Sequence, residues 1–196
     1  MARRDELLAT LERYGALRHG HFLLSSGLHS QVYVQCALLL ADPRRAREAG
    51  TAVAAELDRL GVSSDSVLSP ALGGVIIGHE VAAALGVPFH FVERDGGTLA
   101  LRRGFTLAGG ERVVVVEDVV TTGRSTVETA AVAEAAGAEV VGIGSILDRS
   151  GGRHGFGVPF AALLSLDLPT WNPEDCPLCA EGSVAVQPGS RPRPRA

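Results

Sequence analysis

The sequence predicts an α/β fold in which a mainly parallel central sheet is flanked by helices. Short segments rich in valine and isoleucine alternate with helical segments, which is the pattern of βαβ units. The run 113–116 is continuously apolar, as expected of a strand that is buried on both faces of a parallel sheet. Polar or glycine-rich turns at 69–74, 117–125 and 148–153 follow predicted strands, at the end where such sheets bind ligands.

The first part of the chain predicts two helices separated by a strand–turn–strand segment. Residues 3–15 form an amphipathic pattern that ends at a glycine. Residues 21–40 alternate loosely around a Ser-Ser-Gly turn, which indicates two strands. In the helix expected over 42–61, Asp42 is suited to cap the first turn and Pro43 to fill its first position.

The rest of the chain supplies the remaining units. Segment 94–111 has two glycine pairs flanking alternating polar and apolar residues, which indicates a mobile hairpin. The tail 187–196, rich in proline and arginine, is expected to be disordered. Helices are predicted at 75–86 and 123–137, each ending at a glycine. Strands are predicted within 65–74, with the glycine-rich turn at its end, and at 87–93, 112–120, 138–149 and 160–169.

Length and composition narrow the class of protein. With 196 residues, 46% of them hydrophobic, the chain is expected to form a single domain, 1–196. The net charge of −4 argues against a nucleic-acid partner. No apolar run is long enough for a membrane span and the amino-terminal residues lack a signal-peptide pattern, so we expect a cytoplasmic protein. All 18 basic residues are arginines, so any task that needs a cation falls to arginine.

The three cysteines, Cys36, Cys176 and Cys179, argue by their odd number against a disulfide framework. Cys176 and Cys179 have the Cys-x-x-Cys spacing of half a zinc site, but a structural zinc ion usually needs four ligands. No second cysteine or histidine pair lies nearby in the sequence, so we expect a structural turn, although a dimer could in principle complete a site. We find no metal-ligand spacing for His29, His79, His90 or His154, and we expect these histidines to be structural or exposed.

The strand 112–120 ends in two adjacent acids, Glu117 and Asp118, which are costly to bury and therefore belong at a surface that needs two carboxylates. The turn that follows offers hydroxyls, a glycine and the amides of a helix start, which together suit a phosphate. Carboxylates accept hydrogen bonds from hydroxyls, so acids beside an anion site fit a ribose 5-phosphate. An ordinary capped strand–helix turn is the alternative. The phosphate-binding turn consists of Thr121, Thr122, Gly123, Arg124 and Ser125.

The segment "VVVVEDVVTTGRS" resembles the phosphoribosyl-pyrophosphate (PRPP) motif of type I phosphoribosyltransferases. "GHFLLSSGLHSQVYVQCALLL", "SPALGGVIIG", "ALRRGF", "SILDR" and "CPLCAEG" resemble the orotate phosphoribosyltransferase branch of that family, in the same order. The resemblance covers roughly residues 15–190. It implies the type I phosphoribosyltransferase fold, with a small hood built from about 1–40 and 160–186.

The resemblance also implies the activity: transfer of the phosphoribosyl group of PRPP to orotate, giving orotidine 5′-monophosphate and pyrophosphate in pyrimidine (UMP) biosynthesis. Mg²⁺ would be the cofactor, held through PRPP, with no direct protein ligand assigned. The partners would be PRPP, orotate and a second copy of the chain in a homodimer.

Residue roles follow from the matched motifs. Glu117 and Asp118 would hold the ribose hydroxyls, and residues 121–125 the 5-phosphate. The turn "SPALGG" matches the family's pyrophosphate loop, where Ala71, Gly73 and Gly74 would present backbone amides. The family often has a lysine in this loop, and here Gly73 stands in the corresponding position.

The expected base site and mobile loop depend on the same resemblance. Arg149 of "LDR" matches the family's orotate-binding arginine, assisted by Thr121 and by Ser25 or Ser26, where the family frequently has a basic residue. The family's mobile loop carries lysines that reach pyrophosphate, some from the neighbouring subunit. In this lysine-free chain the candidates to replace them are Arg94 and Arg103, which with Asp118 are the expected catalytic residues, and Arg102 is a further PRPP contact.

Two alternatives remain open at this stage. A phosphoribosyltransferase for a purine or another pyrimidine would carry the same PRPP motif. A PRPP-binding regulator without turnover would also carry it, and the absent loop lysines weigh slightly for that alternative.

Overall fold

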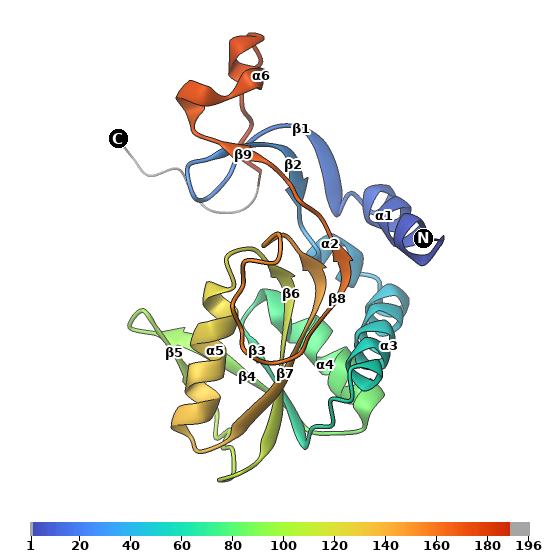
Figure 1. Cartoon of the computed structure of the whole chain (residues 1–196), viewed down its shortest axis with the longest axis vertical. Coiled ribbons are helices and arrows are strands. Elements are labelled where there is room, and N and C mark those ends of the chain that lie inside the picture. Colours follow the sequence, from blue (N-terminus) through green and yellow to red (C-terminus); the bar gives the residue numbers. More distant parts are fainter. Residues whose placement is uncertain (1, 189–196) are drawn as a thin grey trace.

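The computed structural model describes residues 2–188 and contains a six-stranded sheet with helices on both faces and a smaller three-stranded sheet above it (Figure 1). The large sheet has the order β5-β4-β3-β6-β7-β8, and all its neighbouring pairs are parallel except β4 with β5. Its strands are β3 (Ser66–Pro70), β4 (Phe89–Asp95), β5 (Thr98–Leu101), β6 (Arg112–Val120), β7 (Glu139–Asp148) and β8 (Phe160–Ser165). This arrangement confirms the predicted α/β fold with a mainly parallel sheet.

Alternating side chains of β6 face the two helical layers of the large sheet. Val114 and Val116 pack in a core with helices α3 (Pro43–Arg59) and α4 (Gly73–Leu85). Val113 and Val115 pack on the opposite face with helix α5 (Arg124–Ala135). Because both faces are covered, this strand is apolar at four consecutive positions, as its sequence indicated.

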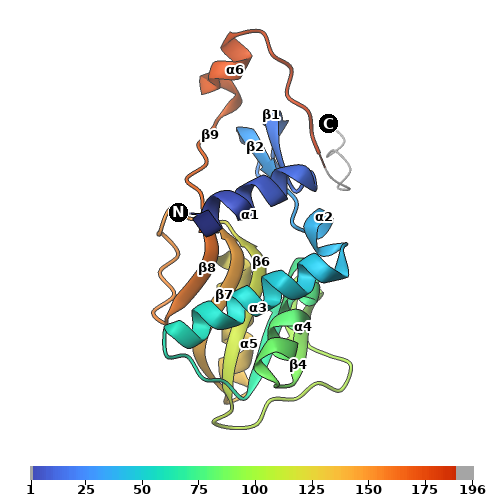
Figure 2. The same cartoon turned by 90° about the vertical axis from the view of Figure 1, so that its right-hand side faces the viewer.

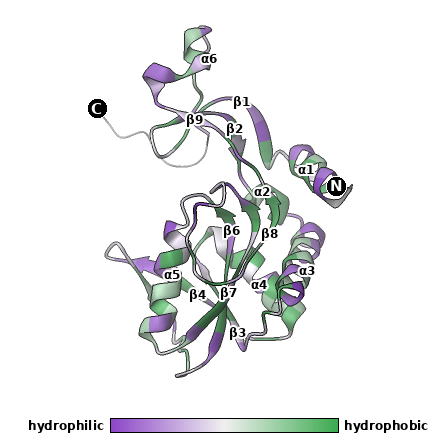
Figure 3. Cartoon of the chain, viewed as in Figure 1, coloured by the Kyte–Doolittle hydropathy of each residue, from purple (hydrophilic) through white to green (hydrophobic). Residues whose placement is uncertain are grey.

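The helices lie where their sequences predicted, to within about two residues at each end, although α4 begins at Gly73, inside the turn predicted at 69–74. The carboxylate of Asp42 accepts a hydrogen bond of 3.0 Å from the amide of Arg44 at the start of α3. Helix α4 ends at Gly86, whose φ of 71° is in the left-handed region that glycine adopts without strain. Hydrophilic and hydrophobic residues alternate along α3 in Figure 3, as expected of a helix with one face on the core.

The smaller sheet is the hood, and it contains β1 (Leu17–Leu23), β2 (His29–Val34) and β9 (Thr170–Trp171), all antiparallel. Helix α1 (Ala2–Arg13) lies at the junction between the hood and the large sheet (Figure 2). There a third core joins the two parts, and its buried side chains are Leu11, Ala16, Leu17, Val32, Leu39, Leu147 and Leu164.

The structure differs from the sequence expectations at three places. Residues 37–40 form a short helix, α2 (Ala37–Leu40), rather than strand, and its residues Leu39 and Leu40 are both buried. Strand β8 belongs to the large sheet, so the carboxyl-terminal part of the hood begins only after residue 165. A 3₁₀ turn, η1 (Pro173–Asp175), and helix α6 (Pro177–Ala180) were not predicted. Most of the tail expected to be disordered lies outside the described residues.

Candidate active site

Three loops meet at one edge of the large sheet, because they follow the carboxyl ends of the adjacent parallel strands β3, β6 and β7. The chain leaves β3 through α4 toward β4 on one side, and leaves β6 through α5 toward β7 on the other. The crevice between β3 and β6 is therefore the topological switch point, where open α/β sheets bind ligands. The loops at 71–74, 121–125 and 149–153 are the turns that the sequence singled out.

The two acids at the end of β6 are mostly buried. The hydroxyl of Thr126, one turn into α5, donates a hydrogen bond of 2.5 Å to Glu117 Oε2. Burial, opposed by this hydrogen bond and aided by the charge of Asp118, raises the pKa of Glu117 to about 7. Burial also raises the pKa of Asp118, whose Oδ1 accepts a hydrogen bond of 2.9 Å from the amide of Val119.

Neither acid forms an ion pair with a basic side chain of the described residues. Two buried, uncompensated carboxylates are unfavourable in an isolated fold. Hydroxyl donors or a cation would stabilise them, as is expected where a ligand binds. Thr126, which positions Glu117, was not predicted, although it lies one residue beyond the phosphate-binding turn.

The loop after β3 packs directly on the second acid. A Cβ atom added at Gly73 would lie 2.7 Å from Asp118 Oδ1, and one at Gly74 would lie 2.9 Å from the carbonyl oxygen of Val116. A larger residue at Gly74 would therefore clash with backbone, and one at Gly73 would push the Asp118 carboxylate aside. The structure therefore brings the predicted pyrophosphate loop, including Ala71 at its start, against the predicted ribose site.

The turn between β6 and α5 has the geometry of an anion site. Gly123 precedes the helix with a φ of 76°, and a Cβ there would lie 2.8 Å from the ring of Phe156. Thr121, Thr122 and Arg124 are exposed and Ser125 is half-buried, so their polar groups remain accessible at the positive end of the helix.

Arg149 follows β7 beside this turn, and its amide donates a hydrogen bond of 2.7 Å to the carbonyl oxygen of Val120. Its guanidinium is half-buried, and burial lowers its pKa. The buried Nε has no hydrogen-bond partner among the described residues. An unpaired guanidinium N–H at this depth suits an acceptor supplied by a ligand, such as a carboxylate.

The predicted loop arginines contact acids in this structure. Arg94, on β4, forms an ion pair of 2.7 Å with Glu128 of α5, which also accepts a hydrogen bond of 2.8 Å from Arg124. Arg103 forms a 2.7 Å pair with Glu93. Arg102 lies 3.2 Å from Asp95. The β4–β5 pair forms a hairpin, but it pairs 92–95 with 98–101 around the first glycine pair, so the predicted hairpin over 94–111 is confirmed only in part. Arg94 lies near the end of its first strand.

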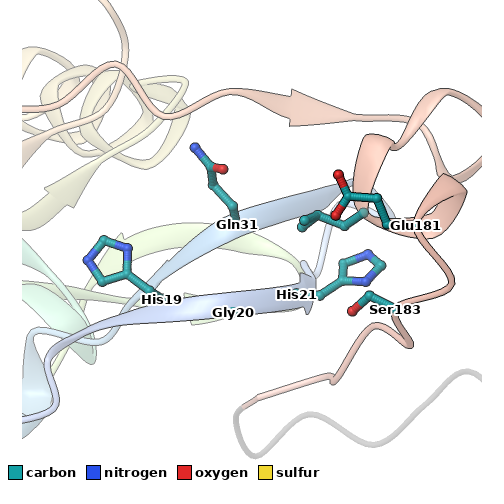
Figure 4. Close-up of a pocket in the computed structure, with 7 residues that line it drawn as sticks. His19, Gly20, His21, Gln31, Glu181 and Ser183 are labelled. Carbon is teal, nitrogen blue, oxygen red and sulfur yellow. The ribbon is translucent and has the colours of Figure 1, made fainter.

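The hood contains a separate pocket of about 400 Å³, between β1, β2 and the carboxyl-terminal segment (Figure 4). His21 borders it beside Glu181 and Ser183, and no residue of the three loops lines it. Ser25 and Ser26, the predicted base contacts, lie at the exposed tip of the β1–β2 hairpin.

Comparison with known proteins places this site in a family. The sequence model of the phosphoribosyl transferase domain matches residues 37–154, which include all three loops. The orotate phosphoribosyltransferase of Thermotoga maritima is 53% identical over 92% of this chain and 96% of its own length. That of Novosphingobium aromaticivorans is 50% identical over 97% of this chain and 98% of its own length.

Solved structures agree with this placement. The crystal structure of orotate phosphoribosyltransferase from Aeropyrum pernix has a TM-score of 0.68 and 30% identity, covering 82% of this chain and 93% of that one. The Mycobacterium tuberculosis enzyme in complex with inorganic phosphate has a TM-score of 0.67 and 25% identity, covering 85% and 97%.

The fold and the loops define a phosphoribosyltransferase, and the chain belongs to the family of the phosphoribosyl transferase domain. Within that family its relatives of about half-identical sequence are orotate phosphoribosyltransferases.

Proposed function

We propose that the chain is an orotate phosphoribosyltransferase, which transfers the phosphoribosyl group of PRPP to orotate in pyrimidine biosynthesis. The reaction breaks the bond from ribose C1 to the pyrophosphate oxygen and forms a bond from C1 to a ring nitrogen of orotate. The proton on that nitrogen leaves with the pyrophosphate or passes to solvent. The observation that carries the proposal is the meeting of an uncompensated acid pair, an anion-binding turn and the unpaired Nε of Arg149 at one sheet edge.

Each part of PRPP has a matching part of the site. The 5-phosphate is assigned to the turn 121–125 at the start of α5, and the ribose hydroxyls to the carboxylates of Glu117 and Asp118. The pyrophosphate is assigned to the backbone amides of 71–74. These groups hold the sugar in a fixed position for in-line displacement.

Mg²⁺ is the proposed cofactor, because the acid pair and the absence of lysine leave the charge of pyrophosphate without a nearby compensating ammonium. Bound with PRPP, it would neutralise charge that develops on the leaving group. Arg94 and Arg103 are proposed to add to this after leaving their present acidic partners.

A homodimer is the proposed assembly. Leu72 in the pyrophosphate loop is 87% exposed and Ile76, one helical turn further, is 45% exposed. Apolar side chains exposed beside a binding site favour a contact with a second copy of the chain. We place the enzyme in the cytoplasm, where its three unpaired cysteines would stay reduced. Within residues 2–188, no helix has the length and apolar character that a membrane crossing requires.

Arg149 provides the test of the base. Orotate differs from uracil by one carboxylate, and a guanidinium can bind that carboxylate through two parallel hydrogen bonds. Arg149→Ala should lower kcat/KM for orotate by about 10- to 100-fold, which corresponds to the free energy of one hydrogen bond to a charged group. Arg149→Lys should restore only part of the activity, because an ammonium supplies charge without the planar fork. PRPP affinity, measured by calorimetry, should change little.

The matched control is Arg153→Ala, since Arg153 is exposed in the same loop. Equal losses of orotate turnover and PRPP affinity in Arg149→Ala would contradict the assignment. Turnover of adenine or uracil in place of orotate would favour another base, and PRPP binding without turnover would favour a regulator.

A further inference from the structure

Four potential metal ligands meet in the hood, remote in sequence from the phosphoribosyltransferase loops. They are His21, His29, Cys176 and Cys179, and their ligand atoms all lie within 4.8 Å of one another. The histidines come from the two strands of the β1–β2 hairpin and the cysteines from the segment around α6, which lies next to that hairpin in Figure 1. Three of the four residues are buried, and Cys179 is half-buried.

Local structure explains how the four residues meet. The register of β1 against β2 shifts between His19 and Phe22, so His21 lies in an irregular part of the strand. His29 begins β2 opposite Trp171 of β9. The chain that leaves β9 therefore starts beside the histidines, and the turn of η1 and α6 returns both cysteines to them.

Hydrogen bonding alone does not satisfy this cluster. His21 Nε2 lies 2.9 Å from His29 Nδ1, 3.5 Å from Cys176 Sγ and 3.8 Å from Cys179 Sγ. An imidazole nitrogen has one in-plane direction, in which it either donates a proton or accepts one. It cannot serve three partners, whereas a cation at the centre of the four atoms would satisfy all of them.

The distances match tetrahedral zinc. Bonds of about 2.3 Å to sulfur and 2.0 Å to nitrogen give a tetrahedron with edges of about 3.3–3.8 Å. The contacts of His21 Nε2 with the two sulfurs fall at 3.5 and 3.8 Å, and Cys179 Sγ lies 3.3 Å from His29 Nδ1. The histidine nitrogens, at 2.9 Å, would move apart slightly, and the two remaining pairs of ligand atoms also lie within 4.8 Å of each other.

We propose that His21 Nε2, His29 Nδ1, Cys176 Sγ and Cys179 Sγ bind one zinc ion. Two thiolates and two imidazoles in tetrahedral array are a zinc ligand set. Four protein ligands leave no open position for substrate, so the ion is structural rather than catalytic. It is distinct from the Mg²⁺ that would accompany PRPP. The proposal departs from the expectation that Cys176 and Cys179 form a structural turn and that His29 is structural or exposed.

The ion would hold the carboxyl-terminal segment on the hood. Among the described residues 172–188, Cys176 is the buried one, and the others are half-buried or exposed. Besides the cluster, the amide of Val186 donates a hydrogen bond to His21, and its carbonyl oxygen accepts one from Leu23. A segment with so little buried apolar surface needs another source of stability, and metal binding supplies it.

The first experiment measures zinc by mass spectrometry in the full chain, purified without chelators and dialysed. We expect one zinc ion per chain. The content should fall to near zero in Cys179→Ser and in His29→Gln. It should be unchanged in the controls Cys36→Ala, a cysteine in the core away from the cluster, and His19→Gln, an exposed histidine near His21.

A second measurement does not depend on the variants folding. Co²⁺ added to reduced, metal-free wild-type chain should give the intense visible bands of tetrahedral cobalt and a thiolate charge-transfer band, saturating at one equivalent. Zinc should bleach both. Chelator treatment should lower Tm, and zinc should restore it. Wild-type chain with no bound zinc and no such bands, a Cys176–Cys179 disulfide in freshly purified protein, or full zinc content in Cys179→Ser would each overturn the proposal.

Discussion

Gly73 and Asp118 show what a single residue in the sequence could and could not predict. The glycine pair predicted a turn in which the backbone approaches another group closely. The partner of that approach, Asp118, belongs to a different strand, and only the fold brings its Oδ1 within 2.7 Å of where a Cβ would stand. In the same way Arg149 was predicted from the resemblance of its "LDR" segment to the family motif, whereas its unpaired Nε became visible only in three dimensions.

Glu117 leads to a prediction for pH dependence. Its pKa is raised by burial to about 7, from an ordinary value near 4.5, so the folded chain holds this proton more tightly than the unfolded chain. The free energy of unfolding of the ligand-free protein should therefore lose a contribution as pH rises from about 4.5 to about 7. Glu117→Gln removes the titration, so its stability relative to wild type should increase across that window, by up to about 3 kcal/mol.

Urea unfolding at pH 5, 6, 7 and 8 measures this difference. Glu128→Gln is the matched control, because hydrogen bonds from Arg124 and Arg94 lower the pKa of Glu128 and leave it ionised throughout. A stability difference between Glu117→Gln and wild type that stays flat with pH would show that Glu117 is solvated in solution.

At the scale of elements, helices and their ends were the most predictable features. Their determinants are local, such as Asp42 before Pro43 at the start of α3 or Gly86 after α4. Helix α2 was missed because four residues are too few to show a helical period. The arginine contacts of the β4–β5 hairpin were missed because their acidic partners include Glu128, on another element.

The segment that follows β5 holds Arg103 in an unusual backbone conformation. Its φ of 58° is in the left-handed region, which disfavours residues other than glycine by roughly 1 kcal/mol. Arg103→Gly would relieve that strain while losing an exposed ion pair with Glu93, so stability should change by less than about 1 kcal/mol. If the guanidinium meets pyrophosphate in the transition state, kcat should fall at least 10-fold, with a smaller rise in the KM for PRPP.

Arg112→Ala is the control for this variant. Arg112 pairs with Asp65 at 2.8 Å, an exposed ion pair at the opposite edge of the sheet, and should leave kcat unchanged. A wild-type kcat in Arg103→Gly would show that Arg103 takes no part in the reaction.

At the scale of the whole molecule, three hydrophobic cores stabilise the large sheet and attach the hood to it. Two of them lie on opposite faces of the large sheet, and the continuously apolar strand segments in the sequence predicted that both faces are buried. The third joins hood to sheet through residues from both ends of the chain. Long-range meetings of this kind, like that of His21 with Cys176 across 155 positions, leave no local pattern and could not be predicted from spacing.

The last prediction tests the proposed homodimer. If the loop that carries Arg103 serves the site of a neighbouring subunit, the dimer is the catalytic unit. Arg103→Gly and Asp118→Asn chains should each be nearly inactive alone. A mixed dimer would contain one site with an intact Asp118 from one chain and an intact Arg103 from the other. Random mixing of equal amounts makes half of the dimers mixed, each with one good site, so activity should recover to about a quarter of wild type.

The measurement is turnover after co-refolding or co-expression of differently tagged chains, with light scattering to establish the dimer. Ile76→Asp tests the assembly independently, since a charge on this exposed apolar side chain should dissociate the dimer if the side chain is covered. Leu60→Asp, 42% exposed at the end of α3, is the control and should remain dimeric. Mixed dimers that form normally but recover no activity would mean that Arg103 acts on the site of its own chain. A wild-type protein that is monomeric and fully active would show that no site is shared between two chains.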